Sequence, residues 1–371
     1  MKIGLFGGSF DPVHNDHIAI CQQFKKILGL DKVVVMPTKL SPFKSSHVTD
    51  GFHRKKMLEL AFEDCPFVTV SDYELNNDSV SYTYLTVQKL KEDYPECELY
   101  ILMGLDSLAS FLKWRNSGYI LENAILTVAG RNGYDMKAER ERFKKQTGAQ
   151  IYTFEYDGKI SSTYVRELLF LGCSPIDLLP EKVCDYIKEN QLYCGNDLHL
   201  YLQTKLKPSR LFHTAGVAST AVGYAKKLGE SVDNARIAGL LHDIAKYENA
   251  ENYPDCEIPS DCPNSVKHQY LGAYIAQEKL KIDNSEVLNA IRYHTTGRPN
   301  MSTLEKIVFT ADLLEPSRSY DEVDYLRKLV DRDFESGFRK CLERLIVYLQ
   351  KGEEKIFALT ISANEYYNLK K

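Results

Sequence analysis

Short apolar runs alternate with helical patterns through the first half of this 371-residue chain, and no other feature constrains its fold as much. Helical patterns, such as those at 53–63 and 84–92, separate the runs. This alternation predicts a doubly wound α/β domain with a parallel sheet, whose ligands bind beyond the carboxyl ends of the strands. The expected strands are 3–6, 33–36, 68–70, 99–103, 125–129 and 151–154.

The pattern changes near residue 198, and from there apolar residues recur at helical spacings of three and four. The segment YCGND at 193–197 interrupts the helical patterns on its two sides, so we place a boundary there. The expected domains are therefore an α/β domain at 1–193 and an all-α domain at 197–371. The expected helices of the second domain are 213–228, 234–247, 266–280, 285–294 and 303–314.

Composition excludes several classes of protein. Hydrophobic residues make up 44% and charged residues 26%, as in ordinary globular proteins. The net charge of −4 gives no bulk attraction to nucleic acid or to an anionic membrane. The nine cysteines are scattered without a C-x-x-C pair, which favours reduced thiols and a cytoplasmic location. The chain enters its first expected strand directly and has no apolar run near ~18 residues, so we expect neither a signal peptide nor a membrane span.

The segment GGSFDPVHNDH follows the first expected strand. Its glycines permit a tight turn in which backbone amides approach a ligand closely, as at Gly7, Gly8 and Ser9. We expect a helix to begin near Pro12 and to carry two histidines on one face of its first turn. Two imidazoles at a helix N-terminus suit a polyphosphate. The histidines are His14 and His17.

This segment resembles the G-x-F-D-P-x-H-x-G-H signature of the nucleotidyltransferase superfamily, and 160–166, ISSTYVR, resembles its I-S-S-T-x-x-R signature. An adenylyl transfer expels pyrophosphate from ATP and needs positioning and charge stabilisation more than covalent catalysis. The two histidines would donate hydrogen bonds to phosphate oxygens, Arg166 would hold the β- and γ-phosphates, and Mg²⁺ would neutralise the triphosphate. The further phosphate-binding candidates are Lys44, Ser161, Ser162 and Thr163.

Within that superfamily the first half most resembles bacterial nicotinate mononucleotide adenylyltransferase, on segments 50–62, 81–91 and 102–116. The resemblance implies that ATP and nicotinate mononucleotide react to deamido-NAD and pyrophosphate. It also implies that Trp114 stacks on the pyridine ring, an arrangement for which an aromatic face is suited. By the same resemblance Tyr82 and Thr83 shape the nicotinate end, while Gly104 and Asp106 lie on the nucleotide side.

Two positions depart from that family. Asp16 stands between the two histidines, where the family has glycine, and a carboxylate there would repel or crowd phosphate unless it turns to solvent. Phe43 stands where the family often has histidine in P-H-K. Both changes bear on catalytic efficiency more than on the type of reaction.

The helical half carries a second set of chemical groups, distributed in order over successive expected helices. Side chains from several helices of a bundle can converge, and His/Asp sets of this kind build two-metal sites. Mixed His/Asp ligands suit iron, manganese or cobalt without selecting among them. The set consists of His213, His242, Asp243, His268, His294 and Asp312.

This order resembles the HD metal-dependent phosphohydrolases, and segments 210–218, 240–247 and 290–318 resemble the YqeK-type branch, which cleaves diadenosine tetraphosphate symmetrically to two ADP. The resemblance implies that Asp243 bridges two metals, one held with His213, His242 and Asp312, the other with His268 and His294. The metals would activate the attacking water. Lys246, Arg298 and Arg318 are the candidate phosphate-binding cations, with a solvated charged face as the alternative for Arg318.

The expected protein is thus a bifunctional enzyme whose substrates are ATP, nicotinate mononucleotide and diadenosine tetraphosphate. Three alternatives stay open. The first half could instead use phosphopantetheine as acceptor, although Trp114 and the SYT element at 81–83 argue against it. The second half could be a non-catalytic nucleotide sensor or dimerisation module, or a cyclic-dinucleotide phosphodiesterase, although TTGRP at 295–299 lacks the G-Y-P element of that branch. The sequence does not decide whether copies of the chain assemble.

Overall fold

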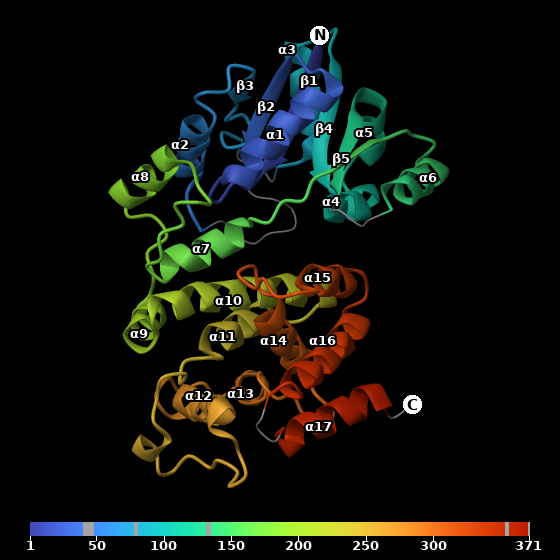
Figure 1. Ribbon diagram of the computed structural model, residues 1–371. Coiled ribbons are helices and arrows are strands. Elements are labelled where there is room, and N and C mark those ends of the chain that lie inside the picture. The colour runs from blue at the N-terminus through green and yellow to red at the C-terminus, as the bar shows by residue number, and fades with distance from the viewer. Residues whose placement is uncertain (40–47, 78–80, 131–134, 353–355, 370–371) are drawn as a thin grey trace. The chain divides into compact units, whose positions relative to one another are not determined.

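The computed structural model describes residues 1–39, 48–77, 81–130, 135–352 and 356–369 (Figure 1). The chain forms two compact units. The first consists of Met1–Val165 and Pro175–Tyr193, and the second of Arg166–Ser174 and Cys194–Lys371. The segment Arg166–Ser174 thus packs within the second unit, although it precedes the boundary expected at 193–197.

The first unit is built on one six-stranded sheet with the order β3-β2-β1-β4-β5-β6, and all its strand pairs are parallel, as predicted. The strand order reverses between β1 and β4, and ligands of such sheets bind beyond the strand ends at that point. The strands end there in Gly8 and Gly104. Their bounds are β1 (Lys2–Gly8), β2 (Lys32–Pro37), β3 (Val68–Val70), β4 (Glu98–Gly104), β5 (Ile125–Gly130) and β6 (Tyr152–Glu155).

Helices flank this sheet, and apolar strand residues such as Ile3, Leu99 and Leu126 form the core between them (Figure 1). The helix after β1 begins at Asn15, so the start expected near Pro12 is wrong. His14 is extended, with φ −144° and ψ 171°, and serves as the N-cap. The helices are α1 (Asn15–Leu28), α2 (Gly51–Ala61), α3 (Thr83–Asp93), α4 (Leu105–Ser110), η1 (Phe111–Lys113), α5 (Ser117–Asn123), α6 (Met136–Thr147), α7 (Ser162–Phe170), which continues into the second unit, and α8 (Glu181–Glu189).

The described part of the second unit contains helices and no strand, as predicted. Its helices are α9 (Asp197–Lys205), α10 (Pro208–Leu228), α11 (Val232–Leu241), η2 (Ala250–Asn252), η3 (Asn264–Val266), α12 (Lys267–Glu278), α13 (Ser285–Arg292), α14 (Thr303–Leu314), α15 (Val323–Arg332), α16 (Phe334–Leu349), α17 (Ala358–Asn364) and the π-helical η4 (Glu365–Leu369).

Helix α10 is the centre of this unit and packs against α11 and α14. A side chain at Gly239 of α11 would place its Cβ 2.7 Å from Ala218 Cα, so the two helices approach as only glycine permits. The helix expected to run to 247 ends at Leu241, because His242 turns its ring back and Nδ1 bonds the Gly239 carbonyl at 2.6 Å. Tight turns follow, and they carry the next residues into the interior of the unit.

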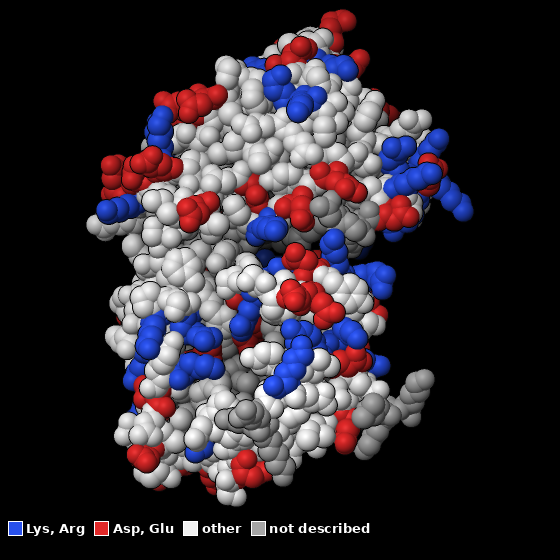
Figure 2. Space-filling view, viewed as in Figure 1, with Lys and Arg blue, Asp and Glu red and all other residues white. Residues whose placement is uncertain are grey.

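The described helices include none that is long and apolar enough to cross a membrane. On the face shown in Figure 2, Lys and Arg side chains are interspersed with Asp and Glu side chains on each unit. A mixed distribution of this kind produces no extended field of one sign. It agrees with the small net charge of −4.

Candidate active sites

A buried ionic scaffold supports the glycine-rich turn of the first unit. Asp11, 4% exposed, accepts hydrogen bonds from the Tyr193 hydroxyl at 2.7 Å and the Val48 amide at 2.9 Å. Arg54 is only 1% exposed, and its Nη1 donates to the Ser9 carbonyl at 2.7 Å. Arg54 was not among the residues selected from the sequence. Its spacing from the apolar residues on the buried face of α2 could have indicated that it is buried.

His14 and His17 lie against each other with their ring centroids 3.7 Å apart. The backbone amide of His14 donates to Nδ1 of His17 at 3.2 Å, so a neutral His17 ring carries its proton on Nε2. Burial lowers the pKa of His14 to about 3 and, with a contribution from His14, holds the pKa of His17 well below its usual range. Both rings are therefore neutral groups near pH 7, suited to hydrogen bonding rather than to carrying charge.

The ISST segment returns to this turn from the far end of the unit. Ser162 Oγ donates to the Pro12 carbonyl at 2.9 Å, and Ser161 Oγ caps α7 by accepting the Tyr164 amide at 3.1 Å. The structure thus brings Ser162 to the turn that also carries His14. Thr163 is the second residue of α7. Arg166, one turn further, is counted with the second unit, and Lys44 lies outside the described residues.

Residues expected at the pyridine end lie after other strands. Tyr82 is the N-cap of α3, Thr83 is its first residue, and the Arg115 guanidinium stacks 5.0 Å from the Tyr82 ring centroid. Trp114 is half-buried at the end of η1, and its Nε1 is buried without a hydrogen-bond partner among the described residues. An unsatisfied buried indole N–H is unusual, because such groups normally find an acceptor.

Gly104 and Asp106 lie where β4 meets α4. A side chain at Gly104 would place its Cβ 2.7 Å from Asp106 Oδ1, so a larger residue there would displace the Asp106 carboxylate from the strand end. Asp106 itself is exposed in the first turn of α4. These two residues therefore stand at the edge of the sheet where the strand order reverses.

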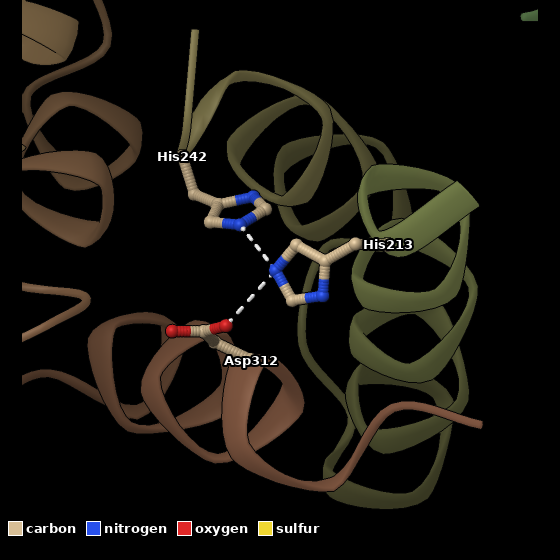
Figure 3. A group of neighbouring side chains, drawn as sticks. All are labelled: His213, His242 and Asp312. Carbon is tan, nitrogen blue, oxygen red and sulfur yellow. Dashed lines mark hydrogen bonds and ion pairs between the residues drawn. The ribbon is translucent and has the colours of Figure 1, made fainter. Parts of the chain in front are cut away.

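In the second unit six His and Asp side chains converge from five helical segments. Figure 3 shows His213 of α10, His242 after α11 and Asp312 of α14 pointing toward one another. His213 Nε2 lies 3.2 Å from His242 Nε2 and 3.1 Å from Asp312 Oδ1. His242, Asp243 and His294 form a second group of potential ligand atoms, all within 4.8 Å of one another. His268 joins them, with its Nε2 3.3 Å from His294 Nε2.

The Asp243 carboxylate, 2% exposed, divides these histidines into two sets. Its Oδ2 lies 3.4 Å from His242 Nε2 and 3.8 Å from His213 Nε2. Its Oδ1 lies 3.1 Å from His268 Nε2 and 3.7 Å from His294 Nε2. Each oxygen therefore faces its own pair of imidazoles. A carboxylate placed in this way can bridge two cations.

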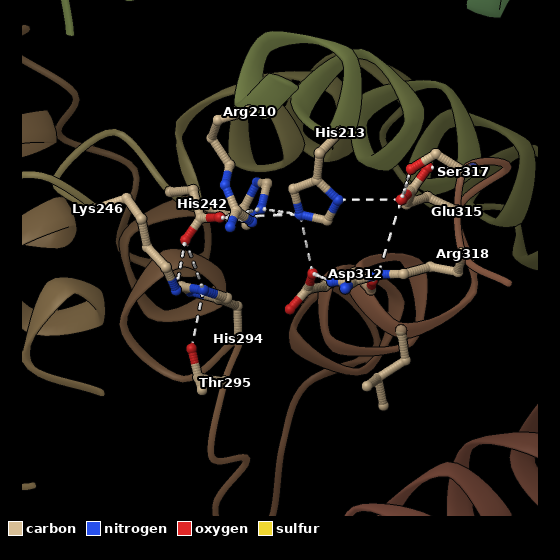
Figure 4. Close-up of polar contacts among 12 residues, drawn as sticks. Arg210, His213, His242, Lys246, His294, Thr295, Asp312, Glu315, Ser317 and Arg318 are labelled. Atoms are coloured by element: carbon tan, nitrogen blue, oxygen red, sulfur yellow. Dashed lines mark hydrogen bonds and ion pairs between the residues drawn. The ribbon is translucent and has the colours of Figure 1, made fainter. Parts of the chain in front are cut away.

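In three of the imidazoles, a contact at Nδ1, the ring nitrogen that faces away from the cluster, fixes the orientation of the ring. His242 Nδ1 bonds the Gly239 carbonyl at 2.6 Å, and His294 Nδ1 bonds the Ile291 carbonyl at 2.8 Å. His213 Nδ1 lies 3.1 Å from Glu315 Oε1, as Figure 4 shows. Because a carbonyl only accepts, Nδ1 of His242 and of His294 carries the proton and Nε2 presents a lone pair inward. Inward Nε2 atoms held by outer acceptors are typical of metal ligands.

These residues pass a direct test for divalent metal binding. Asp243 Oδ1 is buried and lacks an aligned hydrogen-bond donor among the described residues. Burial would raise the pKa of Asp243, but the surrounding histidines lower it well below its usual range, so the carboxylate is ionised. Burial also lowers the pKa of His242, and that of His268 to about 4, so these imidazoles are neutral. His213 differs, because against the effect of burial its contacts with Asp312 and Glu315 raise its pKa, so a metal bound there would displace its proton. Neutral imidazoles and ionised carboxylates are the ligand forms that a divalent metal requires.

Three cationic side chains contact the carboxylates of this centre, and all three are labelled in Figure 4. Lys246 Nζ lies 3.6 Å from Asp243 Oδ1, while Arg318 Nη2 donates to Asp312 Oδ1 at 2.7 Å. Arg210 donates to Asp243 Oδ2 at 2.8 Å. Arg298 differs, because its guanidinium makes two 2.7 Å hydrogen bonds to Glu305, which is 1% exposed. Arg318 is therefore no solvated surface charge, and Arg298 is tied to a carboxylate outside the His/Asp cluster.

Arg210 and Glu315 were not among the residues selected from the sequence. Arg210 precedes His213 by three residues, so both lie on one face of α10, and this spacing was a usable signal. Glu315 is fully buried beside His213. It was visible in the EPSR segment, but nothing in that segment indicates that its side chain turns toward α10.

Comparison with known proteins matches one family to each part of the chain. The Cytidylyltransferase-like family model matches residues 5–168, and the HD domain model matches residues 210–317. The chain therefore combines a nucleotidyltransferase-type α/β unit with an HD-domain unit.

A protein of Mycoplasma pneumoniae named probable nicotinate-nucleotide adenylyltransferase/Ap4A hydrolase is 30% identical over 360 residues, which cover 94% of this chain and 100% of the relative. The chain belongs to this family of fused adenylyltransferase/Ap4A hydrolase proteins. A probable nicotinate-nucleotide adenylyltransferase of Salmonella gallinarum is 35% identical over 206 residues, covering 51% of this chain and 97% of that protein.

Among solved structures, a predicted HD superfamily hydrolase involved in NAD metabolism from Clostridium acetobutylicum is 36% identical. The match covers 47% of this chain and 96% of the Clostridium protein, with a TM-score of 0.45.

Proposed function

We propose that the first unit transfers the adenylyl group of ATP to nicotinate mononucleotide, and that the second hydrolyses diadenosine tetraphosphate to two ADP. The observation that carries the second assignment is the Asp243 carboxylate, whose two oxygens face separate histidine pairs. The first assignment is supported by the close approach of the glycine-rich turn and the ISST segment, through Ser162 and Pro12. A relative covering the whole chain bears both names.

The transfer reaction makes modest demands on the first unit. A phosphate oxygen of nicotinate mononucleotide attacks the α-phosphorus of ATP, a P–O bond forms, and pyrophosphate leaves with the electron pair of the broken bond. The attacking oxygen carries no proton near neutral pH, so no general base is needed. Neutral His14 and His17 would donate hydrogen bonds to phosphate oxygens whose charge grows during the displacement. Mg²⁺ bound to ATP would neutralise part of the triphosphate charge.

Recognition of the acceptor would fall to the residues after β4 and at the start of α3. The Trp114 ring offers an aromatic face, and its Nε1, which has no partner in the part of the chain that the structure describes, would donate to a polar group of a ligand. Tyr82 and Thr83 would border the nicotinate end, while Asp106 would contact the nucleotide side. These roles fit a flat pyridine nucleotide better than the flexible chain of phosphopantetheine.

In the second unit two divalent transition metals, of the class iron, manganese or cobalt, would supply a Lewis acid and activate water for attack on phosphorus. His213, His242 and Asp312 would hold one metal, His268 and His294 the other, and Asp243 both. Lys246 and Arg210 lie beside Asp243 and would balance phosphate charge there. Arg318 would keep the Asp312 carboxylate oriented.

Product analysis of one preparation tests both assignments. With ATP and nicotinate mononucleotide the protein should release pyrophosphate, and equal release with phosphopantetheine would contradict the assigned acceptor. With Mn²⁺ or Fe²⁺ the same protein should convert diadenosine tetraphosphate to ADP. Tight binding of that nucleotide without turnover would instead identify the second unit as a nucleotide sensor. Metal analysis of the preparation would identify the ion.

A further inference from the structure

The carboxylate of Asp16, in the first turn of α1, is tied to the segment that leads into α7. Its Oδ2 accepts the backbone amide of Ile160 at 2.7 Å. Its Oδ1 accepts the Tyr156 hydroxyl at 3.1 Å, and that hydroxyl also lies 3.1 Å from the Asp16 carbonyl oxygen. The half-buried side chain therefore directs its carboxylate to these two donors. The sequence analysis had expected a carboxylate here to repel or crowd phosphate unless it turned to solvent.

The segment at 156–160 fits closely around this carboxylate. A side chain at Gly158 would place its Cβ 3.0 Å from Asp16 Oδ2 and 2.7 Å from the Tyr156 ring, so a larger residue there would displace one of these two side chains. Two turns of α1 further, Gln23 Nε2 donates to the carbonyl of Glu155, the last residue of β6, at 3.0 Å. Two side chains of α1 thus hold the end of β6 and the segment that follows it.

We infer that Asp16 is a positioning residue for adenylyl transfer, which fixes the ISST segment beside the histidine-bearing turn. Ile160, the residue bonded to Asp16, directly precedes Ser161 and Ser162, and the Ser162 hydroxyl contacts Pro12. The glycine that the family has at position 16 cannot make these bonds. Asp16 adjoins His17 in sequence, but its carboxylate accepts hydrogen bonds from Tyr156 and Ile160. Because the segment is already ordered before ATP binds, ATP binding does not have to supply the free energy of ordering it. This inference rests on the proposed transfer function.

Kinetics of the full-length protein test the inference. Asp16→Ala should raise KM for ATP about tenfold, since it removes two hydrogen bonds to the Asp16 carboxylate that order the phosphate-binding segment. KM for nicotinate mononucleotide should stay within about twofold, because the acceptor residues lie on other elements. Asp16→Asn should have a smaller effect, since its amide oxygen can still accept from Ile160. An equal rise in both KM values, or a fall in KM for ATP, would overturn the inference.

Asp31→Ala is the matched control. The Asp31 carboxylate also accepts a backbone amide at 2.7 Å, from Lys2, in the same unit. Its loss should leave both KM values unchanged, and hydrolysis of diadenosine tetraphosphate should be the same in both variants. If Asp31→Ala raises KM for ATP as much as Asp16→Ala does, the effect is general destabilisation and the inference fails.

Hydrogen exchange separates this inference from the proposed function. Peptides covering 156–161 should exchange faster in Asp16→Ala than in the wild type, whether or not the protein transfers adenylyl groups. Unchanged exchange would overturn the positioning role even in an active enzyme. If exchange is faster in Asp16→Ala but the wild type has no transfer activity, the result would support the role of Asp16 in holding this segment and refute the proposed function.

Discussion

The two units present their functional groups in opposite ways. In the first, candidate ligand-binding groups come from turns at strand ends, and the paired histidines His14 and His17 are neutral and hydrogen bond locally. In the second, they come from helices and form a buried cluster in which carboxylates, imidazoles and cations balance one another. The comparison teaches that a site for a phosphate ligand can depend on neutral donors, whereas a metal site needs ionised ligands whose charge is compensated inside the protein.

The largest effect on activity should come from Asp243, whose carboxylate faces both histidine pairs of the second unit. Asp243→Ala should lower diadenosine tetraphosphate hydrolysis by roughly a thousandfold or more, since both metals would lose a ligand. Adenylyl transfer by the same preparation should be retained, and it serves as the control for folding. Loss of both activities together would show that the two sites are not independent.

A structural carboxylate of the second unit should give the next largest effect. Glu167 is 3% exposed, and its two oxygens accept hydrogen bonds from Arg236 at 2.5 and 2.8 Å. Glu167→Ala removes the carboxylate and leaves the guanidinium with its 3.0 Å contact to His199 Nε2, and it should lower the free energy of unfolding of this unit by about 3–5 kcal/mol. Chemical denaturation would measure this. Glu343→Ala, which breaks the exposed pair with Lys340, should cost less than about 1 kcal/mol.

A residue outside the direct ligand set should have a smaller and more specific effect. Glu315 accepts His213 Nδ1 at 3.1 Å and the Ser317 amide at 2.7 Å. Glu315→Gln keeps an acceptor but loses the charge, so it should weaken metal binding roughly 10–100-fold. Titration of the apoprotein with Mn²⁺ would measure this directly. An unchanged metal affinity would mean that Glu315 serves packing alone.

The smallest effect should appear in the pH dependence of stability. Burial lowers the pKa of His14 to about 3, so the unfolded chain binds a proton on this residue more readily than the folded chain does. Stability should therefore fall as pH drops from about 6.5 toward 3. His14→Gln should reduce that loss between pH 7 and pH 5, as measured by urea denaturation. An identical loss in the variant would show that His14 is protonated in the folded protein.

The sequence predicted the parallel sheet and the helical second unit because both follow from apolar periodicity, which is local. It could not predict contacts set by packing between distant segments. Asp16 was recognised as a departure from the family, but its bonds to residues about 140 positions away depend on tertiary structure. Of the two arginines, the sequence favoured Arg298 over Arg318 as a phosphate ligand, yet Arg298 binds Glu305 and Arg318 binds Asp312. Such differences depend on where a neighbouring helix places its carboxylate.

Helix α7 shows that the covalent order of the chain and its division into units do not coincide. Ser162 belongs to the first unit, whereas Glu167 belongs to the second. A cut at 193–197 would separate Glu167 from Arg236 and leave a buried face of the helical fragment exposed. Fragments intended for separate study would each need their own copy of 162–174. The same reasoning implies that a second domain grafted from a relative would need to bring this helix with it.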